Sequence, residues 1–193
     1  HADISAQVSS TVQTLPPSTR AGHEVKKGDL LLELDPVDFE QQVLRAELAL
    51  STAKSELVLL GVERAAAEER AELADQDKAL AEVELARIRE AASKGAAKQR
   101  EVDQVMQKTI TISSSAINMR ELADKFPSRE EQLSSSVETK KAELYLAEEN
   151  LRRCKILSPI DGVIQEVDVR VGEHVTNGKR IAKVVNSGRV EIP

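Results

Sequence analysis

The sequence predicts an α+β fold in which the two ends of the chain form one small β-sandwich, interrupted by a long antiparallel coiled-coil α-helical hairpin. Three observations support this prediction: a repeat of short strands and glycine turns near the two ends, a helix-forming composition between the repeats, and heptad rows in the middle segment. The first half of the sandwich is predicted over residues 1–35, the hairpin over 36–155 and the second half over 156–187. Residues 188–193 are expected to start a further domain.

The repeat relates the two ends of the chain. The segment GHEVKKGDLLLELD, which starts at Gly22, aligns with GEHVTNGKRIAKVV, which starts at Gly172, at an offset of 150 residues. Further upstream the copies align at an offset of 152, so that Val8 matches Ile160. Neither copy is long enough to cover its own apolar face. We therefore expect the two copies to pack together as a β-sandwich with a pseudo-twofold axis.

The helical segment begins at Asp35 and Pro36. An Asp side chain accepts hydrogen bonds from the free N–H groups of a first helical turn, and Pro needs no N–H group there. The helical pattern continues to Gly95, which is expected to adopt the left-handed conformation that ends many helices. A second helix is predicted from about Ala97 to Cys154, with basic residues in its last turn.

Heptad rows are clearest in the second helix. One row, with residues seven apart, consists of Val102, Thr109, Ala116, Ala123, Glu130, Val137, Leu144 and Leu151, and a companion row runs from Val105 to Cys154. The first helix has one row with Val43, Leu50, Leu57, Ala71 and Leu85, and a second row that is mostly alanine. Paired rows of this length indicate a coiled coil. The connection near 93–98 is short, so the two helices should run antiparallel.

Two helix-breaking residues lie at nearly the same height of the predicted hairpin, Gly61 in the first helix and Pro127 in the second. In a helix interior, Pro costs about 3 kcal/mol and Gly about 1 kcal/mol relative to Ala. Two interpretations stay open. The pair forms a shared kink, or Gly61 is an independent surface glycine and Pro127 causes a local bulge.

Composition excludes several classes of protein. Trp is absent, and one Tyr and two Phe do not suit a wide globular core. The net charge of −6 gives no reason to expect a nucleic acid or an anionic membrane surface as partner. No apolar run approaches the roughly 18 residues of a membrane span, and the opening HADIS is not a signal peptide. We expect the chain to be part of a larger protein.

No catalytic, cofactor or metal site is predicted. His23 and His174 lie at equivalent turns of the two copies, but two histidines without a carboxylate cluster are more typical of surface turns than of a metal site. Cys154 is the single cysteine, which excludes an internal disulfide, and its place on a heptad row favours a buried side chain over a reactive thiol. There is no Ser/His/Asp arrangement and no phosphate-binding loop, so the protein is predicted not to be an enzyme.

Two segments carry a resemblance to a known family. VKKGDLLLELDPVDFEQQ (25–42) and CKILSPIDGVIQEVDVRVGEHVTNG (154–178) resemble the two halves of the lipoyl-like, or biotinyl-like, domain of HlyD-like periplasmic adaptor proteins. These adaptors are also called membrane fusion proteins, and they belong to tripartite efflux pumps and type I secretion systems. The order of half-motif, paired helices and half-motif covers nearly the whole chain. The chain departs from the family at Ser10, where Gly is usual, and by the insertion of Pro16 and Pro17.

The predicted hairpin tip resembles the family's channel-binding tip, in which an Arg, a Leu four residues later and a Ser eleven residues later contact a TolC-like outer-membrane channel. Arg87 matches the first of these positions, Ala91 stands in place of Leu and Lys98 in place of Ser. The resemblance thus implies a channel contact around these residues and Lys94 and Gly95. Arg87 as an ordinary solvated charge is the alternative interpretation.

Family resemblance also implies partners and a place in the cell. The protein would lie in the periplasm, anchored to the inner membrane in its full-length form, and residues 188–193 would start a β-barrel domain. It would connect an inner-membrane transporter of the resistance-nodulation-division (RND) or ABC type to the outer-membrane channel. Copies would form a ring, expected to be a hexamer. The first helix is acidic and the second is near neutral, so neighbouring hairpins would meet through unlike faces.

Two other classes of protein fit only part of the sequence. A biotin or lipoyl carrier has the same duplicated half-motif but needs an exposed lysine where the two halves join, and here the helices occupy that junction. Lys155, at the base of the hairpin, is explained by the preference of helix C-termini for positive charge. A plain coiled-coil scaffold would account for residues 36–155 and leave the repeat unexplained.

Overall fold

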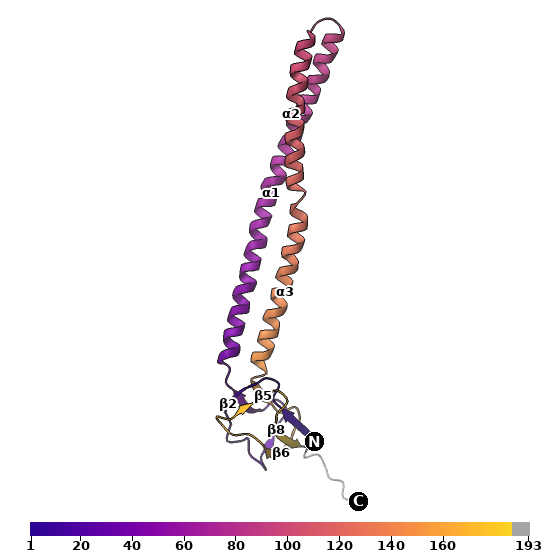
Figure 1. Cartoon of the computed structure of the whole chain (residues 1–193). Helices are drawn as coiled ribbons and strands as arrows, with labels where there is room; N and C mark the ends of the chain where they lie inside the picture. The colour runs from indigo at the N-terminus through magenta and orange to yellow at the C-terminus, as the bar shows by residue number, and fades with distance from the viewer. Residues whose placement is uncertain (187–193) are drawn as a thin grey trace, which may run out of the picture. The chain divides into compact units, whose positions relative to one another are not determined.

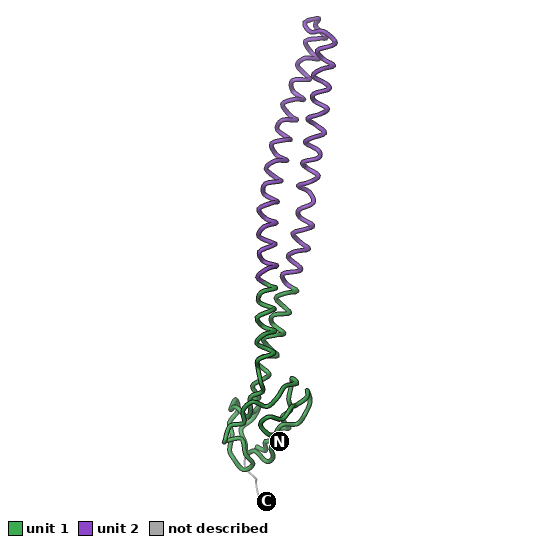
Figure 2. The backbone as a smooth tube through the Cα atoms, turned by 60° about the vertical axis from the view of Figure 1, so that its left-hand side comes forward, with its two compact units in different colours: residues 1–50, 139–193 green, residues 51–138 purple. Residues whose placement is uncertain are grey.

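The structure, a computed structural model, describes residues 1–186 of the chain, so the predicted start of a further domain at 188–193 lies outside the described residues. The chain divides into two compact units (Figure 2). Unit 1 contains His1–Leu50 and Thr139–Pro193, and unit 2 contains Ser51–Glu138. Unit 1 thus combines both chain ends with the adjoining turns of helix.

Unit 1 contains two four-stranded antiparallel sheets (Figure 1). In chain order the strands are β1 (Ala2–Ser5), β2 (Ser10–Thr14), β3 (Glu24–Val25), β4 (Leu30–Leu34), β5 (Lys155–Leu157), β6 (Gly162–Val167), β7 (His174–Val175) and β8 (Arg180–Val185). The strand order is β1-β8-β6-β3 in one sheet and β5-β4-β2-β7 in the other. Each sheet has two inner strands from one end of the chain and two edge strands from the other end. The expected sandwich built by both ends is confirmed.

The predicted pseudo-twofold is visible in the backbone hydrogen bonds. Exchanging the halves turns one strand order into the other, because β1 to β4 take the places of β5 to β8. The N–H group of Gly22 donates to the Ile164 carbonyl at 2.8 Å, and that of Gly172 donates to the Val12 carbonyl at 2.9 Å. These two bonds are equivalent under the repeat.

One core lies between the two sheets. Leu31, Leu32 and Leu34 of β4 are fully buried, as are Ile164 of β6 and Ile181 of β8. Two adjacent β4 residues are both buried because a register shift interrupts the β4–β5 pairing between Leu30 and Leu32. Both chain ends therefore contribute to the same core, and neither half has a separate core of its own.

Gly162 helps to explain why the chain departs from the family pattern at Ser10, its equivalent in the first half. A Cβ atom at Gly162 would lie 2.3 Å from the carbonyl oxygen of Val185, so only glycine fits there. The equivalent residue of the first half is Ser10, and its hydroxyl donates a hydrogen bond to the carbonyl oxygen of Asp35 at 2.9 Å. Asp35 is in turn the equivalent of Val185. The first half therefore replaces a close backbone approach with a hydrogen bond to the same carbonyl position.

The first helix, α1 (Val37–Ser93), starts two residues after β4. The N–H group of Val37 donates to the Asp35 side chain at 3.1 Å, which confirms the predicted cap. Asp38 and Glu40 add negative charge to the first turn, where the helix dipole favours it. Gly61 lies within α1 and does not interrupt it.

The second arm of the hairpin differs from the prediction. It consists of two helices, α2 (Gln99–Ala123) and α3 (Phe126–Arg152), in place of one helix from Ala97 to Cys154. The break is caused by Pro127, which has no N–H group and whose ring clashes with a carbonyl four residues earlier. Pro127 instead occupies the first turn of α3, where its lost N–H would have no partner anyway. The interruption thus lies in one arm only.

Two residues at the base of the hairpin also differ from the prediction. The heptad pattern predicts Cys154 on a helical row, but α3 ends before it and its side chain belongs to the core of the β-sandwich. The sequence predicts Lys155 at the end of the helical segment, yet it is the first residue of β5, and its ammonium group lies 3.8 Å from the Glu33 carboxylate of β4. Both side chains serve the sheet structure.

Within unit 2 the predicted heptad row of α2 faces the hairpin interior. Val102, Thr109, Ala116 and Ala123 are buried at intervals of seven residues. Leu60 and Ala71 are buried on α1. The Thr109 hydroxyl donates to the Val105 carbonyl of its own helix at 2.9 Å and lies 3.3 Å from the Ala81 carbonyl of α1, so Thr109 and Ala81 lie at the same height of the hairpin.

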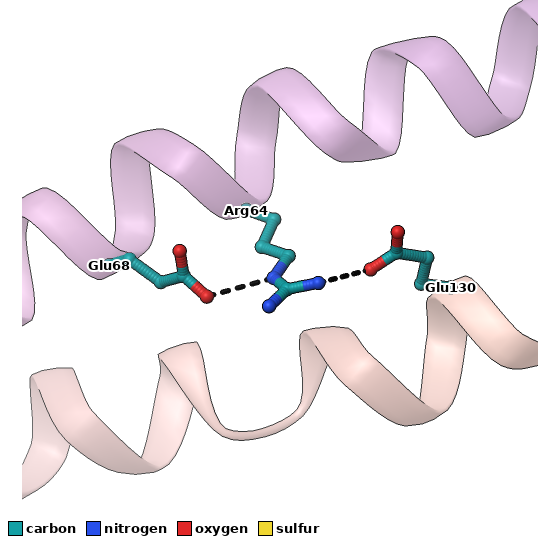
Figure 3. Close-up of polar contacts among 3 residues, drawn as sticks. All are labelled: Arg64, Glu68 and Glu130. Atoms are coloured by element: carbon teal, nitrogen blue, oxygen red, sulfur yellow. Dashed lines mark hydrogen bonds and ion pairs between the residues drawn. The ribbon is translucent and has the colours of Figure 1, made fainter.

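An ion-pair network connects the two arms beside the break (Figure 3). The Arg64 guanidinium of α1 binds the Glu68 carboxylate of the same helix at 2.8 Å and also the Glu130 carboxylate of α3. The hydrogen bonds that the guanidinium donates to Glu68 and Glu130 raise the pKa of Arg64. On the other side of the break, Arg120 of α2 pairs with Asp75 of α1. The interruption between α2 and α3 therefore lies between two contacts that hold the arms together.

A pair of identical substitutions tests the packing at Gly162. We expect Gly162→Ala to destabilise the sheets by about 1–3 kcal/mol or more, because the added methyl group collides with backbone and not with a movable side chain. Gly61→Ala is the matched control. It meets nothing within 4 Å and should stabilise α1 by up to about 1 kcal/mol. Native-state hydrogen exchange, resolved by peptide, measures both effects locally. Equal effects at the two positions would contradict this account.

Candidate functional site

The candidate site is the connection between α1 and α2, where the sequence places the hairpin tip. Helix α1 ends at Ser93 and α2 begins at Gln99. Gly95 has φ +74°, so its left-handed conformation is as predicted. The N–H group of Ala96 donates to the Ala91 carbonyl at 2.9 Å and that of Gly95 to the Ala92 carbonyl at 3.0 Å. This is the Schellman arrangement that satisfies the last carbonyl groups of a helix.

The side chains of the tip are largely in solvent. Arg87 has a side chain 79% exposed, and its guanidinium lies 3.3 Å from the Glu84 carboxylate one turn earlier. Lys94 is 68% exposed and pairs with Glu90 at 2.5 Å. Lys98 is exposed, whereas Ala91 is half-buried. The structure thus gathers the five predicted residues at one end of unit 2, with the three cations presented outward.

The start of α2 has half of a capping box. The Glu101 carboxylate accepts a hydrogen bond from the N–H group of Lys98 at 3.2 Å. The reciprocal bond is missing, because the Lys98 side chain has no acceptor atom and forms no cap. The departure noted in the sequence therefore leaves one N–H group at the beginning of α2 without a side-chain partner.

The two histidines remain surface residues of separate strand pairs. His23 precedes β3, which pairs with β6, and His174 lies in β7, which pairs with β2 of the other sheet. Among residues 1–186 no group of three or more His, Cys, Asp or Glu side chains could hold a metal ion.

Cys154 is buried, as the sequence predicts. Its thiol lies 3.6 Å from the Asn150 carbonyl. Burial and the nearby carboxylates of Asp35, Glu33 and Glu40 raise the pKa of the thiol to about 11. The thiol is therefore neutral at physiological pH. Because the thiolate is the reactive form of cysteine, Cys154 is an unreactive core side chain.

Sequence reasoning missed one feature of unit 2. Helix α1 exposes a second set of large apolar side chains on the side that faces away from α2 and α3, among them Val62, Leu73 and Leu80. A signal was available, since these residues recur at intervals of seven and eleven outside the two heptad rows of the first helix.

The family model described as RND MFP, barrel-sandwich hybrid domain, matches residues 1–187. The chain belongs to this family of membrane fusion proteins. The predicted resemblance to periplasmic adaptors of efflux and secretion is thereby confirmed at the level of the family. The match includes both halves of the sandwich together with the hairpin. A plain coiled-coil scaffold would leave the two halves of the sandwich unexplained.

Solved structures share the fold of this membrane fusion protein at low identity. MacA from Actinobacillus actinomycetemcomitans is 23% identical with a TM-score of 0.61, and the similarity covers 96% of this chain and 49% of that one. A MacA–MexA chimera with the α-hairpin domain of Pseudomonas aeruginosa MexA gives 23% and 0.51, over 96% and 47%. The soluble domain of LipC, a membrane fusion protein of a type I secretion system, gives 15% and 0.53, over 96% and 99%.

The chain spans about half the length of the two MacA structures. No significantly similar sequence is found among curated proteins. Within residues 1–186, none of the helices has an apolar stretch of the length and hydropathy that a membrane crossing requires.

The incomplete capping box generates a prediction at the tip. Lys98→Ser should complete the Ser-x-x-Glu pattern with Glu101 and stabilise the start of α2 by about 0.5–2 kcal/mol. Slower hydrogen exchange in the first turn of α2 measures the effect. Lys98→Ala is the control, because it removes the same charge without supplying an acceptor. Similar protection in both variants would mean that charge and not capping limits this helix start.

The buried thiol generates a prediction about pH. Because the pKa of Cys154 is raised from 9.0 in its ordinary state to about 11, the folded state keeps its proton while the unfolded state loses it. The resulting stability is present below pH 9 and decreases between about pH 9 and 11. Urea unfolding across this range should show a steeper loss of stability for the natural chain than for Cys154→Ala. Parallel pH profiles for the two chains would contradict the prediction.

Proposed function

We propose that the protein is the periplasmic adaptor subunit of a tripartite transport complex, linking an inner-membrane transporter to an outer-membrane channel for efflux or secretion. The observation that supports this most is the exchange of edge strands between the two chain ends. That exchange ties both arms of the hairpin to one β body, since α1 follows β4 directly and α3 leads directly into β5. A hairpin with both arms anchored in this way suits a protein that bridges two others.

The role of the hairpin tip in this proposal is to contact a TolC-like channel. Arg87, Lys94 and Lys98 offer exposed positive charge around the Gly95 turn, so the matching surface of the channel would be acidic. Ala91 and Lys98 differ from the family's usual tip residues, so we expect the contact to depend on charge more than on the usual Leu and Ser.

Copies pack side by side in a ring, expected to be a hexamer, and the full-length protein is anchored to the inner membrane through parts outside this chain. The adaptor acts mechanically and forms no covalent intermediate. We propose no cofactor, metal ion or nucleic acid as a partner.

The class of transporter is proposed from the family description. The matching family is that of the RND membrane fusion proteins, which favours an RND transporter. An ABC-type exporter of a type I secretion system is the second candidate, because the fold also resembles the soluble domain of LipC over nearly the full length of both chains.

Cross-linking in intact cells tests the proposal. The full-length tagged protein is cross-linked, purified from membranes and analysed by mass spectrometry. We expect recovery of an inner-membrane RND or ABC transporter together with an outer-membrane channel. Recovery of neither component would overturn the adaptor role, and the identity of the transporter decides between the two classes.

The tip is tested within the same experiment. Reversing the charges of Arg87, Lys94 and Lys98 to Glu should reduce the recovery of the channel and leave that of the transporter unchanged. Lys54→Glu with Arg70→Glu is the matched control, because both residues are exposed cations on α1 away from the tip. Equal loss of the channel in the control would show that overall hairpin charge, and not the tip, governs the contact.

A further inference from the structure

The insertion of Pro16 and Pro17 makes the connection from β2 to β3 longer than its equivalent in the second half. The alignment of the two halves changes from an offset of 152 before this insertion to 150 after it, so the first half has two more residues here. The added residues lie in a turn in which the N–H group of Thr19 donates to the Pro16 carbonyl at 2.8 Å. Pro17 is the second residue of this turn, a position that the proline ring favours. The pseudo-twofold is therefore broken at this connection.

An open pocket of about 710 Å³ lies beside this turn, within unit 1. The residues that line it include three pairs with one equivalent residue from each half: Leu15 with Val167, Thr19 with Val169, and Arg20 with Arg170. Both halves of the sandwich thus contribute the same positions to one pocket. Its volume lies within the roughly 300–1,000 Å³ of small-molecule sites.

Two carboxylates of the pocket are already neutralised. Asp168 pairs with Arg180 at 2.5 Å, and Glu173 pairs with Lys179. The hydrogen bond from Lys179 lowers the pKa of Glu173 most, and Arg170 adds a weaker effect. Neither carboxylate therefore depends on the pocket arginines for its partner.

The two equivalent arginines remain available to a ligand. Arg20 and Arg170 are both exposed, and among residues 1–186 their guanidinium groups form neither a hydrogen bond nor an ion pair within 4.0 Å. A guanidinium group can donate two parallel hydrogen bonds to a carboxylate or a phosphate. The pocket thus offers two such donors, one from each half of the sandwich.

Thr19 is the third polar group of the pocket without a side-chain partner. It is 2% exposed, and its hydroxyl has no hydrogen-bond partner among residues 1–186. Its equivalent Val169 is 4% exposed and has no hydroxyl, so packing alone does not require a polar residue here. Buried polar groups of native proteins are nearly always hydrogen-bonded. A ligand with an acceptor atom would give the Thr19 hydroxyl the partner that it lacks.

We propose that this pocket binds a small organic anion. A phosphate or carboxylate group of the ligand accepts hydrogen bonds from Arg20 and Arg170, and the Thr19 hydroxyl supplies a further donor. The apolar part of the ligand packs against Leu15 and Val167. Because the donors come from both halves of the β-sandwich, the bound ligand connects the two chain ends.

Titration with n-hexyl phosphate tests the site on the full 193-residue chain. We expect the methyl NMR signals of Leu15, Val167 and Val169 to shift, and the Tm to rise, because a ligand that binds only the folded state stabilises it. Inorganic phosphate should bind more weakly, since it has no apolar part. Hexyltrimethylammonium, which has the same tail and the opposite charge, should not shift these signals. Absence of shifts with millimolar n-hexyl phosphate, or equal shifts with the cation, would overturn the proposal.

Charge substitutions test the two arginines. Arg20→Gln with Arg170→Gln should weaken the binding of n-hexyl phosphate about tenfold or more, because both charged donors are lost. Arg152→Gln with Arg153→Gln is the matched control, since both are exposed arginines of unit 1 that do not line this pocket. Equal weakening in the two double variants would mean that overall charge attracts the probe, and would overturn the site.

Thr19→Val separates a binding role from a structural one. The variant places the side chain of the equivalent position in the first half and removes a buried hydroxyl that has no partner among the described residues. We expect the free protein to be at least as stable as before, while the affinity for n-hexyl phosphate falls about tenfold. Reduced stability with unchanged affinity would show that the hydroxyl serves the fold, and would overturn its part in the site.

A membrane surface is the other source of phosphate groups. Sedimentation with phosphatidylglycerol vesicles, compared with phosphatidylcholine vesicles, measures that binding. Vesicle binding that is lost in the double arginine variant, without any binding of n-hexyl phosphate, would assign the arginines to lipid and overturn the proposal. The inference does not rest on the transport role: recovery of transport partners with no n-hexyl phosphate bound would refute the pocket alone.

Discussion

The exchange of edge strands between the chain ends is the constraint on which the rest of the structure depends. Strands β2 and β4 need β7 and β5 as neighbours, and β6 and β8 need β3 and β1. Without the other half, each pair of inner strands would expose backbone N–H and C=O groups along both edges, and its apolar side chains would remain in water. The two ends therefore fold together or not at all. This long-range pairing also carries a modest entropic cost, because the cost of closing a loop grows only logarithmically with its length.

In the β-sandwich, the pseudo-twofold symmetry holds for the backbone hydrogen bonds more than for the side chains. Equivalent hydrogen bonds from Gly22 and Gly172 recur in the two halves. At the place where Gly162 allows a carbonyl to approach closely, the first half has Ser10 and reaches the equivalent carbonyl with its hydroxyl. A repeat can thus keep its strand pairing while its side chains diverge, provided that each buried polar group keeps a partner.

The hairpin has little apolar area in its own interior, and much of its apolar area lies outside. Its buried positions include Ala71, Ala116 and Ala123, which allow close approach of the helices but contribute little area. Larger side chains such as Leu73 and Leu80 are more than half exposed. Ion pairs at Arg64 and Arg120 fix the register of the arms on both sides of the break between α2 and α3.

Local rules were sufficient for much of what the sequence predicted. The cap at Asp35, the left-handed Gly95 and the repeat depend on residues close in sequence or on an internal alignment, so they can be found without a structure. Only the tertiary structure decided which strands exchange, because a two-residue strand such as β3 or β7 carries no pairing information of its own. It also decided that Cys154 enters the β core and that Leu73 and Leu80 of α1 stay exposed. Both outcomes depend on which surfaces remain uncovered once the other elements have packed, and heptad spacing alone does not contain that information.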